Sequence, residues 1–255
     1  MPDLTVSRKG PVVRLCLDRP KVRNALSPAL LEALIEACGA VADDDTCSVV
    51  VVSGASGNFS AGADLPQFMA AIGRDAHGTA DLGRRAAEAL KALPQVSIAA
   101  IDGYCIGGGI VLAAACDLRI AADDASFSIP ELDAGIPLSW GGMADLVRLV
   151  GETRALELVL TCRPFTAAEA RECGFLSRVA PADSFADSLA SLVDTVAEKP
   201  RIVLLQTKDK MRRIRAGSFD ARQDAAAMLD ALADEEARQV SRNYIRTRIG
   251  RSGGE

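Results

Sequence analysis

The chain contains a single histidine, His77, and its seven cysteines include no Cys-X-X-Cys pair. A Ser-His-Asp hydrolase would have to use His77, and no Gly-X-Ser-X-Gly nucleophile turn accompanies it, so this class of enzyme is not expected. Scattered cysteines in odd number argue against a disulfide framework or a zinc site and favour reduced thiols in a cytoplasmic protein. We therefore expect no bound metal, and we assign His77 to an exposed loop.

Long apolar runs and an excess of positive charge are also missing. No segment reaches the length of a membrane span and the N-terminus shows no signal segment, so we expect neither membrane association nor export. The formal net charge is −5 at pH 7, and we expect no nucleic-acid partner. The glycine-rich stretch at residues 107–109 matches neither the dinucleotide pattern G-x-G-x-x-G nor the phosphate loop G-x-x-x-x-G-K-[S/T].

The 255 residues are 49% hydrophobic and 25% charged, which is ordinary for a globular protein. Short strands and helices alternate early and helices dominate later, with no Pro/Ser-rich linker, which predicts a mixed α/β domain with a helical end. We expect a mobile cover over a cleft at residues 66–81. The predicted strands are 4–8, 12–17, 48–53, 96–101, 119–121 and 127–129. The predicted helices are 28–42 (capped by Ser27), 82–93, 110–116, 144–150, 154–161, 167–173, 185–198 and 202–215, with an amphipathic helical stretch at 219–248.

Two of the predicted strands each end in a loop of small residues. Strand 96–101 leads to three glycines at 107–109 and then to an apolar helix, and strand 48–53 leads to a loop that contains residues 61–64. A glycine turn before a buried helix also fits simple packing of a helix on a sheet. Two such loops, however, can direct two backbone N–H groups at one carbonyl oxygen, which stabilises an enolate or a tetrahedral oxyanion.

Several motifs occur in an order that resembles a known family. They are VRLCLDRPKVRNALSPALLEAL (13–34), FSAGADL (59–65), AIDGYCIGGG (100–109), FSIPELDAGIP (127–137), TCRPFTAAEARECGFLSRV (161–179) and KPRIVLLQTKDKM (199–211). Over residues 5 to 215 the chain resembles the enoyl-CoA hydratase/isomerase (crotonase) superfamily of fatty acid metabolism. The resemblance implies an α/β fold, with a crotonase-like spiral of ββα units over 1–195. It also implies a C-terminal helical region, 196–255, that assembles homotrimers or hexamers.

The resemblance also implies an acyl-CoA thioester substrate and no separate cofactor. The backbone N–H groups of Ala63 and Gly108 would form the oxyanion hole for the thioester carbonyl. The adenine and pantetheine path of coenzyme A would be lined by residues of the same loop, which are Ala61, Ala63, Asp64 and Leu65. Lys21 and Arg23 lie in a segment that runs near the nucleotide in the family, although a solvated basic turn explains these two residues equally well.

Hydratases of this family carry two catalytic glutamates, and this sequence has one. The first position is occupied by Val111, and the second matches Glu131, which follows apolar residues that would raise its pKa. One carboxylate beside an oxyanion hole suits an isomerase that moves a proton from C2 to C4 of an enoyl thioester. Two alternatives remain open, a hydratase with a substituted second acid (Asp133 first) and an acyl-CoA-binding protein that has lost catalysis.

Two neighbouring positions refine this prediction. Some members of the superfamily place an aspartate at the position of Ser139, and a serine there disfavours the dienoyl isomerase and dehalogenase reactions. Trp140, the only tryptophan, is assigned either to the acyl pocket or to the core, and its size slightly favours the core. Acyl chain length does not follow from the sequence.

Overall fold

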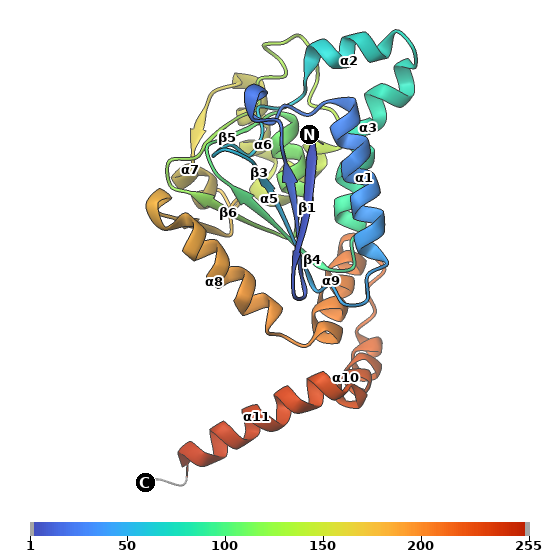
Figure 1. The fold of residues 1–255 in the computed structure, drawn as a ribbon, viewed down its shortest axis with the longest axis vertical. Coiled ribbons are helices and arrows are strands. Elements are labelled where there is room, and N and C mark those ends of the chain that lie inside the picture. The colour runs from blue at the N-terminus through green and yellow to red at the C-terminus, as the bar shows by residue number, and fades with distance from the viewer. Residues whose placement is uncertain (1–2, 253–255) are drawn as a thin grey trace.

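The computed structural model describes the backbone of residues 3–252 and the side chains of residues 3–247 (Figure 1). Its main sheet has six strands in the order β1-β2-β3-β4-β6-β9. They are β1 (Leu4–Lys9), β2 (Val12–Leu17), β3 (Val49–Gly54), β4 (Val96–Ile101), β6 (Leu118–Ala122) and β9 (Arg178–Ala180). β1 and β2 form an antiparallel hairpin, and every later pairing in this sheet is parallel.

Apart from the exposed edge strand β1, the main sheet is buried on both faces, as the run of four valines in β3 shows. Val50 and Val52 belong to the larger core, together with the apolar faces of the helices on that side. Val49 and Val51 point the other way and pack with Leu192 in a second core beneath α8 (Phe185–Ala197). Successive residues of a strand face opposite sides, so a sheet covered on both faces requires a continuous apolar run.

A smaller sheet stands beside the main one. It consists of β5 (Tyr104–Ile106), β7 (Ser126–Ser128) and β8 (Phe165–Thr166). From β4 onwards the chain alternates between the two sheets: it passes from β4 to β5, back to β6, on to β7 and β8, which are both in the smaller sheet, and back to β9. This alternation, with helices between the turns, is the spiral of strand pairs and helices that was expected. β5, β8 and β9 have two or three residues each and were not predicted.

Helices pack in a row on the larger core: α1 (Pro28–Ala42) against α3 (Ala76–Ala92), α3 against α4 (Gly108–Ala115), and α4 against α5 (Gly142–Val150). The predicted cap of α1 is confirmed, because the Ser27 hydroxyl accepts a hydrogen bond from the N–H of Leu30 at 3.1 Å. Every residue of α4 is buried. A helix that is apolar on all sides fits only in the interior, which explains why α4 is enclosed by its neighbours.

The segment 66–81 is helical, which corrects the assignment of His77 to a loop. It is divided between α2 (Leu65–Ile72) and the first turns of α3, with His77 exposed near the start of α3. Both starts are capped: Asp64 accepts from the N–H of Gln67, and Asp75 accepts from the N–H of Gly78. Side-chain caps of this kind satisfy N–H groups that have no partner within the helix. Whether the segment moves as a cover stays a prediction.

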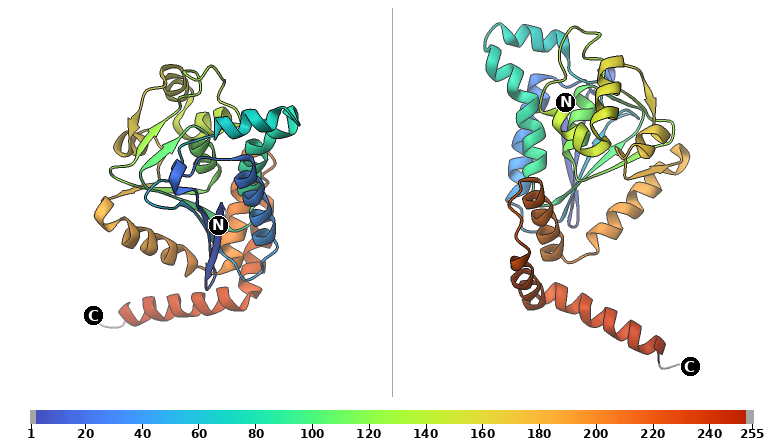
Figure 2. Two further views of the ribbon diagram at one scale, coloured as in Figure 1. Left: turned by 45° about the horizontal axis from the view of Figure 1, so that its top comes forward. Right: turned by 180° about the vertical axis from the view of Figure 1, so that it is seen from behind.

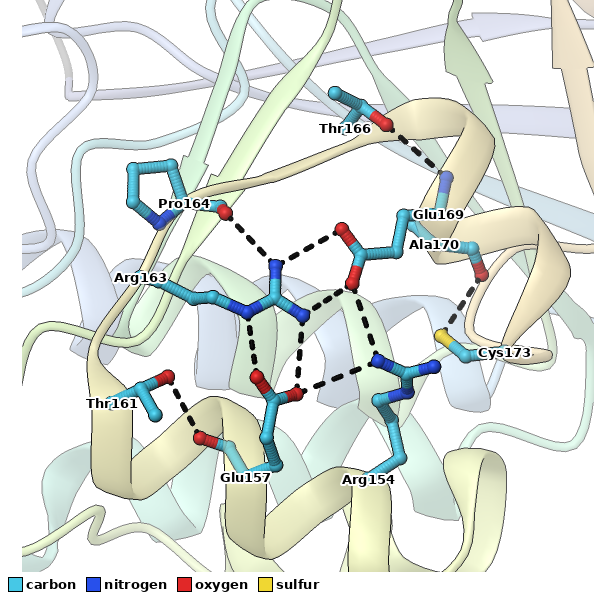
Figure 3. Close-up of polar contacts among 9 residues, drawn as sticks. All are labelled: Arg154, Glu157, Thr161, Arg163, Pro164, Thr166, Glu169, Ala170 and Cys173. Atoms are coloured by element: carbon cyan, nitrogen blue, oxygen red, sulfur yellow. Dashed lines mark hydrogen bonds and ion pairs between the residues drawn. The ribbon is translucent and has the colours of Figure 1, made fainter.

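An ion-pair cluster joins α6 (Glu152–Thr161) to α7 (Ala167–Glu172) on the surface (Figure 3). The Arg163 guanidinium contacts Glu157, with Nε 2.6 Å from Oε1, and also Glu169. Arg154 reaches the same two carboxylates at 3.5 and 3.4 Å. Hydrogen bonds from Arg163 lower the pKa of Glu157 and of Glu169. The cluster fixes the corner between the two helices and lies on partly exposed side chains.

The C-terminal part contains three long helices, of which α9 (Arg201–Arg215) is anchored on the main sheet. Lys208 Nζ lies 2.7 Å from Asp117 Oδ2 and donates to the carbonyl oxygen of Gln95 at 2.7 Å. α10 (Asp224–Ala233) and α11 (Glu235–Ser252) extend away from the rest of the chain (Figure 2). The predicted single stretch at 219–248 is therefore two helices. The boundary predicted after residue 195 falls inside α8. The division of the chain into two regions and its assembly into trimers or hexamers stay predictions.

In the described part of the chain, no helix is long and apolar enough to cross a membrane. All seven cysteines are free thiols, and five of them are buried.

Candidate active site

The two small-residue loops lie side by side. The N–H of Ser60 donates to the carbonyl oxygen of Tyr104 at 2.8 Å, and the N–H of Ile106 donates to the carbonyl oxygen of Ser60 at 3.0 Å. These are hydrogen bonds of the parallel-strand type, and they join the loop after β3 to β5. The pairing holds the segments that follow it, which contain Ala63 and Gly108, at the same cavity.

The backbone N–H groups of Ala63 and Gly108 are available as donors. Gly108 is the first residue of α4, where an N–H has no acceptor within the helix. Among the hydrogen bonds of the described residues, neither of these two N–H groups has a protein acceptor. The positive end of the α4 dipole lies at the same place and favours negative charge there. Both loops that were expected to supply donors thus border one cavity. That the two N–H groups form an oxyanion hole stays a prediction.

The cavity has a volume of about 240 Å³ and is bordered by α2, α3, the start of α4 and the loop 131–140. Its lining is largely hydrocarbon. The fourteen lining residues are Ala63, Leu65, Phe68, Met69, Ile72, Ala80, Gly108, Val111, Glu131, Ile136, Pro137, Leu138, Ser139 and Trp140. Glu131 is the only ionisable side chain in this set.

Glu131 reaches the cavity across the turn that precedes α4. A Cβ atom on Gly107 would lie 2.6 Å from Glu131 Oε1, so the carboxyl group packs directly on a glycine that also adopts φ +48°. Its Oε2 atom is buried and has no hydrogen-bond partner among the described residues. Burial raises the pKa of Glu131 above the ordinary value of 4.5. A partly buried carboxylate with one buried, unpartnered oxygen and a raised pKa has the properties of a base at a functional site.

Among the residues that the structure describes, no second acid lines the cavity with Glu131. Val111, at the first family position, is 1% exposed and contributes only hydrocarbon to the cavity. Asp133, the candidate replacement, is exposed and does not line the cavity. Ser139 does line it, with its hydroxyl donating to the carbonyl oxygen of Pro137 at 3.1 Å. The described residues also contain no cluster of three metal-binding side chains.

Trp140 both lines the cavity and packs on the core. Its indole contacts the ring of Phe68, with the centroids 5.7 Å apart. Trp140 thus contacts the core, one of the two alternatives drawn from the sequence, and also lines this cavity. That the cavity is the acyl pocket stays a prediction. Sequence reasoning missed Phe68, Met69 and Ile72, which line the cavity from α2. The spacing of Leu65, Phe68, Met69 and Ile72 follows the period of a helix and could have identified this wall.

Only some of the residues predicted on the coenzyme A path line the cavity. Ala63 and Leu65 line the cavity, whereas Ala61 and Asp64 do not. The N–H of Ala61 donates to the carbonyl oxygen of Arg23 at 2.9 Å. The Asp64 carboxylate caps α2 and lies 2.9 Å from Nη1 of Arg19.

Lys21 and Arg23 lie on an exposed turn near the loop that contains Ala61. The Arg23 guanidinium lies 4.9 Å from the centroid of the Tyr104 ring. Contacts of these residues with coenzyme A stay predictions.

Comparisons with known proteins agree with this geometry. Residues 7–246 match the family model described as enoyl-CoA hydratase/isomerase. The chain is 36% identical over 214 residues to the 2,3-dehydroadipyl-CoA hydratase of Escherichia coli, covering 84% of this chain and 83% of that protein. It is 33% identical over 210 residues to a probable enoyl-CoA hydratase of Mycobacterium tuberculosis, covering 82% of this chain and 81% of the relative.

Solved structures give the same result. An enoyl-CoA hydratase from Bacillus anthracis superposes with a TM-score of 0.88 at 28% identity, covering 96% of each chain. A putative enoyl-CoA hydratase from Thermobifida fusca, solved in complex with acetoacetyl-CoA, has a TM-score of 0.83 at 30% identity and covers 91% of this chain and 95% of that one. The fold is thus the crotonase-like fold that was predicted. The chain belongs to the enoyl-CoA hydratase/isomerase family and is an enzyme that acts on acyl-CoA thioesters.

Proposed function

We propose that this enzyme shifts the double bond of a 3-enoyl-CoA to the 2-position, with Glu131 as the one acid/base. The observation that carries the proposal is the lining of the cavity: it contains one ionisable side chain, Glu131, and the position of the first family glutamate is a buried valine, Val111. An isomerase needs one group that takes a proton and returns it elsewhere, and Glu131 is sufficient for this.

The proposed reaction has two steps. The Glu131 carboxylate removes a proton from C2, and the electron pair moves onto the thioester oxygen to give a conjugated dienolate. The N–H groups of Ala63 and Gly108 donate to that oxygen, where charge develops. Protonated Glu131 then returns the proton to C4, and the C2–C3 double bond forms. The raised pKa of Glu131 makes its carboxylate a stronger base for the first step.

The hydrocarbon walls support this route over addition of water. Hydration of a 2-enoyl thioester requires an oriented water molecule and, in the family, two carboxylates that share it. Val111 offers no hydrogen bond to such a water, and Asp133 lies outside the cavity. Hydratase activity is the second candidate, because the relatives named above are called hydratases.

The deciding experiment offers 3-enoyl-CoA and 2-enoyl-CoA separately to one purified sample, in ordinary and in heavy water. We expect fast conversion of the 3-enoyl thioester and little formation of 3-hydroxyacyl-CoA. In heavy water, deuterium should appear at C4 in those product molecules for which the proton on Glu131 exchanged with solvent before it was returned. Fast hydration of the 2-enoyl thioester would overturn the isomerase in favour of the hydratase. Tight binding without either reaction would identify an acyl-CoA-binding protein.

A further inference from the structure

The indole ring of Trp140 fills the gap between α3 and α4. A Cβ atom on Gly83 of α3 would lie 1.8 Å from Cδ2 of the indole, and one on Gly108 of α4 would lie 2.3 Å from Cζ3. Both distances are far below van der Waals contact, so the ring occupies the space that a side chain on either helix would need. Two helices therefore carry glycine at the positions where they face this ring.

The backbone of Trp140 is held in an unfavourable conformation. Its φ is +61°, in the left-handed region that bulky residues rarely adopt. The side chain is only partly buried, because one part of the ring packs on Gly83, Gly108 and Phe68 while another part lines the cavity. A strained backbone that aims a large ring into a helix–helix gap at the edge of a cavity indicates a functional constraint on this residue.

The ring lies next to the reacting end of the cavity. Gly108, against which it packs, is also the residue whose N–H is the proposed donor to the thioester oxygen. Behind the ring is α3, so removal of the indole would open the cavity of about 240 Å³ into the gap between α3 and α4. Phe68 and Val111, which are both buried, also line the cavity.

We infer that Trp140 is the specificity-determining residue of this enzyme, and that its indole restricts the substrate to a short, straight hydrocarbon acyl group. Longer or branched groups would need the space between α3 and α4 that the ring occupies. The inference rests on the proposal that this cavity receives the acyl group. It does not depend on whether the bound thioester is isomerised or hydrated.

Because Trp140 is the only tryptophan of the chain, its fluorescence reports on this position alone. The first experiment titrates the unmodified protein with saturated acyl-CoAs, butanoyl-CoA to dodecanoyl-CoA, and with free coenzyme A. We expect a saturable change in the emission of Trp140 with butanoyl-CoA, weaker binding of the long thioesters, and little change with coenzyme A alone. An emission spectrum that stays constant while calorimetry detects acyl-CoA binding would overturn the inference.

The second experiment compares kcat/KM along the same range of chain lengths for the parent protein, Trp140→Phe and Trp140→Ala. We expect the ratio of long-chain to short-chain kcat/KM to rise at least about 10-fold in Trp140→Phe and more in Trp140→Ala, because pocket contacts discriminate by roughly this factor per methylene. Met211→Ala is the control, since Met211 is an exposed residue of α9 that does not line this cavity. It should leave the preferred chain length unchanged.

The outcomes separate the two proposals. If the enzyme hydrates 2-enoyl-CoA, the same ratio is measured on that reaction; if it turns over neither substrate, dissociation constants of the saturated thioesters replace kcat/KM. An unchanged chain-length preference in folded Trp140→Phe would overturn the role of Trp140, as would an equal shift in Met211→Ala. If Trp140→Ala does not fold, Trp140→Phe and the fluorescence titration still decide.

Discussion

A Cβ atom on Gly83 and Cδ2 of Trp140 would be 1.8 Å apart, so these two residues fit together only because Gly83 has no side chain. Gly83→Ala should lower the free energy of unfolding by about 1–3 kcal/mol, because overpacking outweighs the better helix propensity of alanine. Gly39, in α1, has no atom within 4 Å of its Cβ position. Gly39→Ala should therefore raise stability by about 0.4–1 kcal/mol. Urea denaturation of both variants measures the difference, and an equal effect would contradict the packing described here.

Glu131→Gln should lower kcat by a factor of roughly 100 to 10,000, the usual contribution of a general acid/base. The amide keeps the size of the carboxyl group, so the dissociation constant of a saturated acyl-CoA should change little. Asp133→Asn is the matched control, because it removes an exposed carboxylate from the same loop without touching the cavity. Steady-state kinetics that showed the larger loss in Asp133→Asn would assign the catalytic acid to Asp133.

The raised pKa of Glu131 predicts how activity depends on pH. The carboxylate is the proposed base, so kcat/KM should fall as the pH decreases through a value above the ordinary 4.5 of a glutamate. A pH–rate profile of the parent protein measures this limb. A midpoint at or below the ordinary value would show that burial does not act on the catalytic group.

The same shift predicts an effect of pH on stability. Burial raises the folded-state pKa of Glu131 above its unfolded-state pKa. The contribution of Glu131 to the free energy of unfolding is therefore most favourable at pH values below the unfolded-state pKa, and it is lost as the pH rises through the folded-state pKa. At neutral pH the buried carboxylate is therefore destabilising, and Glu131→Gln should have a higher Tm than the parent protein. The difference should shrink as the pH falls below the ordinary glutamate value. A lower Tm of the variant at pH 7 would contradict the direction of the shift.

Val111→Glu should convert the proposed isomerase towards a hydratase. The new carboxyl group would stand at a position that lines the same cavity as Glu131, and a pair of carboxylates can orient a water molecule. We expect measurable formation of 3-hydroxyacyl-CoA from 2-enoyl-CoA, at some loss of stability because position 111 is 1% exposed in the parent. Val111→Gln, similar in size but without a titratable group, is the control and should not gain hydration.

Lys208→Met should lower the free energy of unfolding by about 3–5 kcal/mol, because it leaves the Asp117 carboxylate without its cation in a largely buried site. Lys210, two positions further along α9, pairs with Asp224 on the surface at 2.7 Å. Lys210→Met should change stability by less than about 1 kcal/mol. Chemical denaturation of the two variants compares a buried with an exposed ion pair on one helix, and equal losses would argue against the anchoring of α9 by Lys208.

Much of the main sheet and of the candidate site follows from local sequence. The Ser27 cap, the valine run of β3 and the glycines before α4 each encode their structure within a few residues. The convergence of the two loops could also be expected, because parallel strands of one sheet end at the same edge. Glu131 was found through its motif, and the structure adds that its Oε2 atom is buried and has no hydrogen-bond partner among the described residues.

The remaining features depend on contacts between residues that are far apart in the sequence. The short strands β5, β8 and β9 are defined by their partners rather than by propensity. The fit of Trp140 between Gly83 and Gly108 cannot be read from any of the three segments alone. Likewise, Asp64 looks like a ligand contact in its loop, and only the fold brings Arg19 to its carboxylate.

Both proposed oxyanion donors are main-chain atoms, and this has a consequence for how the protein can change. A point mutation can remove a side-chain donor at any position, but a backbone N–H disappears only when proline is introduced. At position 63 nearly every single substitution therefore keeps the proposed donor, whereas at position 108 a new side chain would keep the N–H but would also have to displace the ring of Trp140. Positions 111, 131 and 140 have no such protection. New reactions and new substrates can thus arise at these three positions while thioester activation is inherited unchanged.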